Sequence, residues 1–406
     1  MKKILSIIAI TLLLTSCDWI NPDDPEFDYN LKSAKVITTN NNFGLELFNK
    51  ILGDEEKANV MISPASISLA LGMTYNGAET TTKDAFENVL NYDGLSREEV
   101  NEICRDLIEV LVTNSKGNLV EIANSIWYRE GFPVHQDFLD MNSMYFDAEV
   151  RDIDFASSTA VDAINDWVSD KTHNKIDKII DQLSAETMML LINALYFNCV
   201  WEYEFDPDET AELTFYNDDQ SEFGKVEMMK TESSFRYAST DDFIAVELPY
   251  KNEKFSMQLF LPTYESSVDE LIELLDGEQW NNWQDQFSMN DEVQVCMPKF
   301  KFDYKRSIGP DLIDMGLGEA FTAAADFSGI SDIPLLISQV IHKTFIDCNE
   351  EGTEAAAVTA VVMDLTSVGP SQPIVINFNR PFLFAITENS SKSIVFIGKV
   401  AEPEYE

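Results

Sequence analysis

The sequence predicts one large α+β domain over about residues 36–406, on three observations. Helical periodicity dominates the first half of the chain, and strand-length apolar or alternating segments dominate the second half. No Gly/Ser linker, repeat or low-complexity run divides this stretch. Helices followed by strands are typical of α+β folds with large antiparallel or mixed sheets. Apolar residues make up 45% of the chain, enough for a sizeable core.

The helices of the first half are indicated by apolar spacing and by one capping signal. Residues 43–52 carry apolar side chains at helical spacing, and so do residues 159–171. Ser63 followed by Pro64 predicts a helix start, because serine caps a helix and proline suits its first turn.

The strands of the second half are indicated by short apolar or alternating runs. Residues 188–197 are apolar almost throughout, which predicts a central strand covered on both faces. Further strands are predicted, in chain order, at residues 243–250, 254–261, 292–302, 345–348, 374–378, 383–387 and 394–400.

The N-terminus has the pattern of a targeting segment. Two lysines precede the apolar run Ile4–Leu14, which is too short to span a membrane. Small residues before Cys17 resemble a bacterial lipoprotein signal, with an ordinary secretory signal as the alternative. We therefore expect a signal peptide over 1–16, a lipid on Cys17, an acidic tether over 17–35, and a membrane-anchored protein in a bacterial envelope, periplasmic or cell-surface.

The charge balance excludes several classes of partner. With 28 Lys+Arg against 71 Asp+Glu, the net charge is −43. Such a field repels nucleic acid, and no basic patch suggests heparin binding. The charge either steers cationic partners or only keeps the protein soluble.

The sequence contains no motif for a metal site, a cofactor site or an enzyme active site. Beyond Cys17 there are four cysteines, Cys104, Cys199, Cys296 and Cys348, without a CxxC pair or a histidine at zinc-ligand spacing. Buried structural thiols are expected, and the sequence leaves a disulfide open. The chain has no GxSxG, HExxH or phosphate-binding loop, so we expect no cofactor and no enzyme activity.

The segment 349–373 fits neither a connection nor a disordered tail. It is too long for an ordinary loop and too apolar for disorder. On strand alternation its residues from Thr353 to Met363 put small or apolar side chains on one face, with no proline before Val368. This favours a latent strand, although an Ala-rich helix or a solvated flap fits the spacing equally well.

Several short motifs occur in a fixed order along the chain. They are Asn59–Ile67, Ala123–Trp127, Tyr145–Glu149, Asn193–Phe197 with Trp201 and Glu202, Pro298–Lys301, Ala325–Ile330, His342-Lys343, Glu350–Ala360, Phe378–Phe382 and Gly398–Val400. Together they resemble the motifs of serpins, the serine protease inhibitor family. Each motif is modest, but their order and spacing over about residues 36–403 are specific. The resemblance implies a serpin fold with three sheets, eight or nine helices and an exposed reactive loop.

The resemblance also implies a suicide mechanism. A protease attacks the loop, forms an acyl-enzyme and is trapped when the loop inserts into the central sheet, so the partner is a target protease bound covalently by a monomer. The implied hinge comprises Gly352, Thr353, Glu354, Ala355, Ala356, Ala357, Val358 and Thr359. Counting from its glycine as in serpins places the cut between Thr366 and Ser367, with Leu365 or Met363 as nearby alternatives. Threonine there suits an elastase-like protease, and Leu365 a papain-like one.

Five further residues match serpin positions that govern opening of the sheet. They are Ser63, Ser66, Asn193, His342 and Trp201. The alternative function is a non-inhibitory serpin that acts as a protease substrate, carrier or interaction module, although such members usually carry bulky, charged or proline residues in the hinge.

Overall fold

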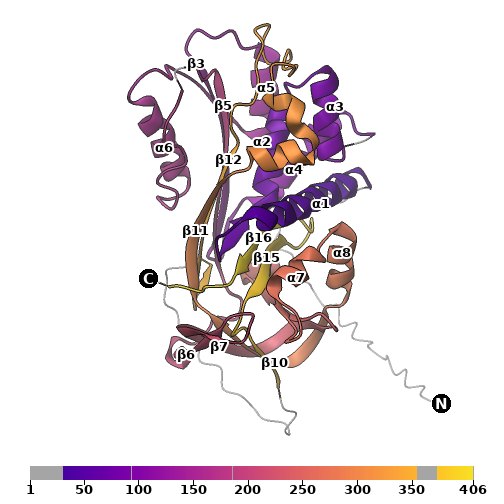
Figure 1. The fold of residues 1–406 in the computed structure, drawn as a ribbon, viewed down its shortest axis with the longest axis vertical. Helices are drawn as coiled ribbons and strands as arrows, with labels where there is room; N and C mark the ends of the chain where they lie inside the picture. Colours follow the sequence, from indigo (N-terminus) through magenta and orange to yellow (C-terminus); the bar gives the residue numbers. More distant parts are fainter. Residues whose placement is uncertain (1–30, 93, 185, 354–372, 406) are drawn as a thin grey trace, which may run out of the picture.

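The computed structural model describes residues 31–92, 94–184, 186–353 and 373–405. These residues form the predicted α+β domain (Figure 1). Its nine described α-helices are α1 (Leu31–Asp54), α2 (Pro64–Tyr75), α3 (Thr80–Val89), α4 (Arg97–Leu111), α5 (Gln136–Phe146), α6 (Ala160–Lys171), α7 (Val268–Glu273), α8 (Gly277–Asp285) and α9 (Gly309–Leu312).

Sixteen strands accompany these helices in the described part of the chain. They are β1 (Val60–Ile62), β2 (Thr113–Ser115), β3 (Asn118–Arg129), β4 (Glu149–Ile153), β5 (Met189–Val200), β6 (Ala211–Tyr216), β7 (Glu222–Ser239), β8 (Phe243–Pro249), β9 (Phe255–Pro262), β10 (Ser288–Pro298), β11 (Phe300–Ser307), β12 (Ile341–Cys348), β13 (Gly352–Thr353), β14 (Ile374–Asn377), β15 (Phe382–Glu388) and β16 (Ile394–Val400).

The three predicted helical signals are confirmed. Residues 43–52 lie in α1, and residues 159–171 correspond to α6. Ser63 caps α2 by accepting the amide of Ser66, and Pro64 stands in the first turn. The cap places two serines, Ser63 and Ser66, at a buried helix N-terminus, and both belong to the predicted site.

Two mixed sheets hold the domain together in the described residues. The nine-stranded sheet has the order β1-β16-β15-β9-β8-β7-β10-β14, with β6 beside β7. The seven-stranded sheet has the order β11-β12-β13-β5-β3-β2, with β4 beside β3. Where the resemblance implied three sheets, β7 is long enough, at 18 residues, to pair with β6, β10 and β8 and so to connect two of them.

The seven-stranded sheet lies between helices on both of its faces (Figure 1). Figure 1 shows α6 on one of its faces and α1 to α5 on the other. Residues 294–298 of β10 lie in the other sheet, and the chain crosses at Lys299 into β11.

Two strand predictions are wrong in part. The single strand predicted at 292–302 is two strands, because the chain changes sheets at Lys299, directly after Pro298. The strand predicted at 188–197 exists as β5, but seven of its twelve residues are only half-buried. Its second edge pairs only with the two residues of β13, so the cover that a neighbouring strand would give is missing.

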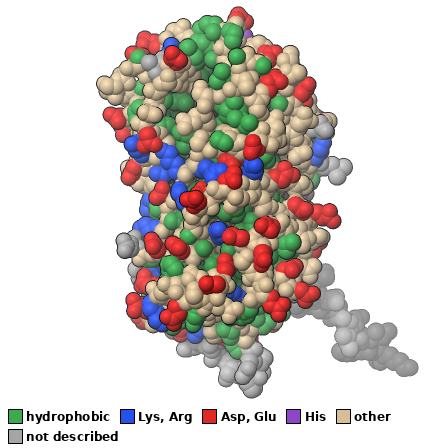
Figure 2. Space-filling view, viewed as in Figure 1, with side chains coloured by type: hydrophobic (Ala, Val, Ile, Leu, Met, Phe, Trp, Pro, Cys, Tyr) green, Lys and Arg blue, Asp and Glu red, His purple; other side chains and the backbone are tan. Residues whose placement is uncertain are grey.

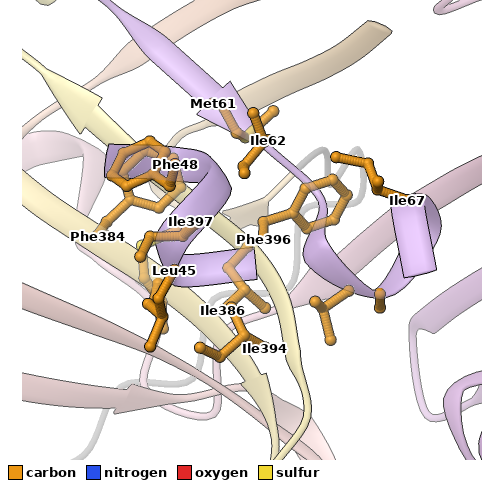
Figure 3. Packing of buried hydrophobic residues seen from close by; sticks show 14 of the residues in the cluster. Leu45, Phe48, Met61, Ile62, Ile67, Phe384, Ile386, Ile394, Phe396 and Ile397 are labelled. Carbon is orange, nitrogen blue, oxygen red and sulfur yellow. The ribbon is translucent and has the colours of Figure 1, made fainter. Parts of the chain in front are cut away.

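The main core lies where α1 and α2 pack on the nine-stranded sheet. Figure 3 shows Leu45 and Phe48 of α1 against Phe384 and Ile397, which come from β15 and β16. All four side chains are fully buried. The start of α2 is joined to the same sheet, because the Ser63 hydroxyl donates to the carbonyl of Val395 on β16.

The visible surface is mostly acidic, and one side of it is more basic than the rest (Figure 2). Figure 2 shows acidic side chains over most of the visible face and Lys and Arg gathered at mid-height on the left. Lysines of β11 and β12 are ion-paired rather than free: Lys305 contacts Asp181 at 2.8 Å, and Lys343 contacts Asp303 at 3.8 Å.

Candidate functional site: the hinge at the mouth of the seven-stranded sheet

The two central strands of the seven-stranded sheet, β5 and β12, are joined only by the short strand β13. Thr353 pairs with Cys348 of β12 on one side and with Cys199 of β5 on the other, antiparallel to both. In the described part of the chain, no other strand lies between β5 and β12, and the two do not pair directly. The sheet therefore has a place for a longer strand between β5 and β12, and β13 occupies only its first two positions.

The hinge glycine is required by a close approach of backbones. A Cβ on Gly352 would collide with the carbonyl oxygen of Cys199 and with Cα of Val200. Only glycine lets β13 lie this close to β5. The next residue, Thr353, is 3% exposed, and its hydroxyl lies 2.6 Å from that of Tyr250, so the first step of a strand is already buried.

Trp201 lies at the turn that leads into β13. Its indole stacks on Tyr250 at 4.5 Å between centroids, and its Nε1 donates to the carbonyl of Asn349 at 2.9 Å. Its backbone amide donates to the carbonyl of Glu351. The contacts by which Trp201 packs are therefore the same contacts by which it holds the turn before β13. They lie at the end of the sheet where β13 enters.

An ion pair that sequence reasoning missed also holds this turn. Glu350 contacts Nζ of Lys299 at 3.3 Å and accepts from the hydroxyl of Thr210 at 2.8 Å. Both charged side chains are nearly buried, with 13% of Lys299 and 12% of Glu350 exposed. In the sequence Glu350 stands in the charged hinge, but its partner lies in a predicted strand interior, and spacing alone could not join them.

Four of the predicted control residues come together beneath the gap. The amide of Ser63 donates to Nε2 of His342 at 3.0 Å, and the Ser63 hydroxyl accepts the amide of Ser66. The Ser66 hydroxyl donates to Oδ1 of Asn193. This polar chain connects β12 to β5 through the start of α2, although the two strands do not touch each other's backbone.

The polar chain continues one residue beyond those predicted. Nδ2 of Asn193 donates to Oδ1 of Asn124 on β3 at 2.7 Å, and Nδ2 of Asn124 donates to the carbonyl of Phe146 at 2.6 Å. Asn124 is 2% exposed. An asparagine inside an apolar strand is the signal that could have identified it, because a buried amide needs partners.

His342 is neutral and serves as an acceptor. Burial lowers its pKa to about 4, and it is 6% exposed. Its Nε2 accepts a backbone amide rather than a serine hydroxyl, so it does not activate Ser63 as a nucleophile. The hydrogen bond links β12 to the start of α2.

The described cysteines are free thiols. Cys104, Cys199, Cys296 and Cys348 are all buried and unpaired by disulfides. Burial raises the pKa of the Cys199 and Cys348 thiols well above the ordinary value, so both stay protonated beside β13. They pack at the hinge as small apolar groups.

Several predicted residues lie outside the described residues. They are Cys17, Glu354, Ala355, Ala356, Ala357, Val358, Thr359, Met363, Leu365, Thr366 and Ser367. Among the residues that are described, no cluster of three metal-ligating side chains occurs, and no helix is long and apolar enough to cross a membrane.

Comparisons with known proteins agree with this geometry. The model of the family described as Serpin (serine protease inhibitor) matches residues 38–403. An uncharacterized serpin-like protein of Methanosarcina acetivorans is 35% identical over all of this chain and 97% of its own length. Human neuroserpin is 31% identical over 89% of this chain and 90% of its own length.

Solved structures show the same fold. Native tengpin, a thermophilic serpin, superposes with a TM-score of 0.83 at 35% identity, covering 93% of this chain and 96% of its own. Native protease nexin-1 with heparin gives 0.81 at 27% identity, covering 91% of this chain and all of its own. The family model over residues 38–403 and the 35% identical relative show that the chain belongs to the serpin family.

Proposed function

We propose that this chain is an endopeptidase inhibitor of the suicide type. A protease attacks the loop near Thr366–Ser367, and the freed hinge side inserts between β5 and β12 before the acyl-enzyme is hydrolysed. The observation that carries the proposal is β13, in which Thr353 already pairs with both flanking strands.

The register of β13 gives the proposal a specific geometry. If the antiparallel pairing continues beyond Thr353, Thr359 arrives between His342 of β12 and Asn193 of β5. These two residues are the ends of the polar chain through Ser63 and Ser66. The inserting strand would thus replace a side-chain connection between the two halves of the sheet with backbone hydrogen bonds to both.

The physical scale of insertion suits the trapping of an acyl-enzyme. An insertion of roughly 15 residues at ~3.3 Å each would carry the protease about 50 Å. New ladder hydrogen bonds at ~1 kcal/mol apiece sum to on the order of 10 kcal/mol or more. Loss of a single oxyanion-hole donor slows hydrolysis ~10²- to 10³-fold, so a modest distortion of the protease suffices.

The target class follows from the residues at the proposed cut. Thr366 suits an elastase-like serine protease with a small primary pocket, and Leu365 suits a papain-like cysteine protease. Both are compatible with the small hinge residues, which permit insertion whichever protease cuts.

The test is formation of a covalent complex. The domain without residues 1–30, which keeps all of α1, is incubated with an elastase-like and a papain-like protease, and the products are separated on denaturing gels. We expect a band of the summed masses and, after cleavage alone, a higher melting temperature. Clean cleavage without a complex or a stability gain would favour the substrate alternative.

Two matched variants locate the effect in the gap. Thr353→Arg puts a charge on a buried hinge position and should convert the inhibitor to a substrate. Met289→Arg places the same side chain on β10, where Met289 is 63% exposed, and should inhibit like the parent. Unchanged inhibition by Thr353→Arg would contradict insertion between β5 and β12.

We propose also that the protein is exported and anchored by a lipid on Cys17. The support is the sequence of the N-terminal segment alone. Metabolic labelling with a radioactive fatty acid in a bacterial host should mark the full chain and not a Cys17→Ser variant. Equal labelling of the two proteins would exclude lipidation at this residue.

A further inference from the structure

A cavity of about 750 Å³ lies between two helices and one face of the nine-stranded sheet. Its walls are one face of α1 and one face of α8, which lie side by side (Figure 1). The wall residues are Ile37, Thr38, Asn41 and Asn42 from α1, with Trp280, Asn281, Gln284 and Asp285 from α8. A cavity of this volume is of the size that encloses an organic ligand.

The floor of the cavity is a hydrogen-bonded row of polar side chains across three strands. Arg236 of β7, Glu247 of β8 and Gln258 of β9 are partners in the strand register. Nη1 of Arg236 donates to both carboxylate oxygens of Glu247 at 3.0 and 3.1 Å, and Nε2 of Gln258 donates to one of them at 2.9 Å. A sheet face beneath helices is normally apolar, and apolar side chains of similar volume would pack there at least as stably. The polar row therefore indicates a role beyond packing.

The row continues onto α8, where one buried donor has no partner. Gln258 and Gln284 exchange both amide hydrogen bonds, at 2.7 and 2.9 Å. Trp280, one turn earlier on the helix, lines the cavity and is 4% exposed, but its indole N–H makes no hydrogen bond to any described residue. Because a buried donor normally has a partner, this N–H is available to an oxygen of a ligand.

Amides are the most frequent polar side chains of the lining. They are Asn41, Asn42, Gln258, Asn281, Gln284 and Asn389. An amide offers both donors and an acceptor, and a hydroxyl group does the same, so such a lining suits a ligand with several hydroxyl groups. The side chains of Asn42 and Asn281 make no hydrogen bond to the described residues, which leaves both amides to that ligand.

Tyr203 adds an exposed aromatic ring to the lining. It is 42% exposed, and its ring packs edge-on against Phe235 at 5.5 Å between centroids, which holds it in place. An aromatic face gives the C–H groups of a sugar ring an apolar surface to stack on, while its hydroxyl groups bond to polar neighbours.

The charges of the lining favour an uncharged ligand. Two basic side chains, Arg236 and Lys392, stand against three acidic ones, Glu247, Glu253 and Asp285, so they nearly cancel. The whole chain carries a net charge of −43, which repels anions.

We propose that this cavity binds a neutral oligosaccharide. Tyr203 stacks on a sugar ring, Trp280 donates to a ligand oxygen, and the amides of Asn42 and Asn281 pair with hydroxyl groups. The site is separate from the gap between β5 and β12, so saccharide binding and protease inhibition are independent properties.

The test begins with the full chain on an array of neutral glycans built from glucose, galactose, mannose and N-acetylglucosamine. The glycan with the strongest signal is then titrated by calorimetry. A sulfated heparin fragment and a long-chain alcohol serve as the anionic and apolar comparisons. We expect saturable binding of at least one neutral glycan and none of either comparison.

Two substitutions with matched controls locate the binding. Tyr203→Ala removes the stacking ring and should weaken binding about tenfold, and Trp280→Phe removes the free N–H and should weaken it about threefold to tenfold. Tyr264→Ala removes another exposed tyrosine, and Trp283→Phe changes a buried tryptophan of α8 that packs on Phe243 at 4.8 Å and does not line the cavity. Both controls should stay within about twofold of the parent. Tyr203→Ala, at a half-exposed position, keeps the test valid if Trp280→Phe fails to fold.

Three outcomes would overturn the proposal. The first is no saturable binding of any neutral glycan at millimolar concentration. The second is equal weakening in Trp283→Phe and Trp280→Phe with none in Tyr203→Ala, which would mean a general loosening of α8. The third is preferential binding of the heparin fragment or the alcohol, which would assign the cavity to another class of ligand. None of these outcomes depends on whether the chain inhibits a protease.

Discussion

The two sheets of this molecule are built to different degrees of completeness. In the nine-stranded sheet, every residue of β9, β15 and β16 is buried, and each of these strands pairs on both sides. In the seven-stranded sheet, β5 and β12 alternate buried and half-buried residues, and they share a partner only two residues long. The central strands of the nine-stranded sheet are thus fully paired and buried, whereas the seven-stranded sheet has room for a longer strand between β5 and β12.

The two sheets are held together by different kinds of contact. Burial and pairing in the nine-stranded sheet supply a rigid base on which α1 and α2 sit. The seven-stranded sheet depends instead on side chains, because His342, Ser63, Ser66 and Asn193 connect β12 with β5 where backbone bonds do not. Side-chain connections can be broken one at a time, whereas a strand ladder resists as a unit.

The largest expected effect tests the contrast in burial. Phe384→Ala removes a fully buried ring that lies 5.6 Å from that of Phe300, and it should lower the free energy of unfolding by ~3–5 kcal/mol. Leu190→Ala in half-buried β5 should cost about half as much or less. Urea unfolding of both variants checks this.

A second substitution at Phe384 separates the effect of lost side-chain volume from the effect of burial. Phe384→Leu keeps most of the volume and should cost less than ~1.5 kcal/mol. If Leu190→Ala destabilised the protein as much as Phe384→Ala, the claimed difference between the two sheets would be wrong.

The next effect concerns pH and the buried histidine. The folded-state pKa of His342, about 4, lies below the ordinary value of 6.5, so native His342 resists protonation. Its stabilising contribution is therefore complete above pH 6.5 and is lost as the pH falls toward 4, by on the order of 3 kcal/mol. An imidazolium cannot accept the Ser63 amide, so acid should loosen the link between β12 and α2.

The measurement is the free energy of unfolding between pH 7.5 and pH 4 in the parent and in His342→Gln. Glutamine offers an uncharged acceptor that does not titrate in this range. We expect the slope with pH to be shallower in the variant, with the difference concentrated between pH 6.5 and 4. Parallel slopes would mean that other groups, and not His342, carry the acid sensitivity.

The sequence could predict the complete sheet better than the open one. β8, β9, β15 and β16 follow from apolar runs of ordinary strand length, and each was placed within one or two residues. β5 is predicted as a strand covered on both faces, whereas seven of its twelve residues are only half-buried. Hydrophobicity reports what a strand can bury, and it cannot report that a neighbouring strand is missing.

The third prediction addresses the side-chain link itself. Asn193→Ala would leave the Ser66 hydroxyl and Oδ1 of Asn124 without their partner, at a cost of about 2 kcal/mol. Gln258→Ala, a loss of comparable size in β9, removes an amide bonded to Glu247 and Gln284.

Only one of these two variants should open the sheet. We expect Asn193→Ala to shorten the half-life of inhibitory activity several-fold and Gln258→Ala to leave it nearly unchanged, as followed by residual inhibition over time at 37 °C. Similar half-lives for the two variants would show that general stability, rather than the link between β12 and β5, limits opening.

The sequence could predict those residues of the site that belong to short motifs. Gly352, Thr353 and Trp201 were singled out from short motifs, and the structure places all three at the mouth of the sheet. Tyr250 was not, and Lys299 belongs to the motif Pro298–Lys301 without a predicted role at the hinge, since both reach the hinge from distant parts of the chain. Contacts of that kind depend on where the chain crosses between sheets, and no periodicity in the sequence records that crossing.

The smallest expected effect concerns the contact that connects the two sheets directly. Thr344 of β12, 3% exposed, donates its hydroxyl to the carbonyl of Met61 on β1 at 2.9 Å. Thr344→Val keeps the shape and removes the donor, which should cost about 1 kcal/mol in urea unfolding. Because this bond ties β12 of the seven-stranded sheet to β1 of the nine-stranded sheet, the variant should also lose inhibitory activity somewhat faster on storage. Thr387→Val on β15 is the matched control, since it changes the same residue type at a buried position wholly within the nine-stranded sheet. Faster loss in both variants would place the cause in stability alone, whereas faster loss in Thr344→Val alone would show that the complete sheet restrains the open one through β12.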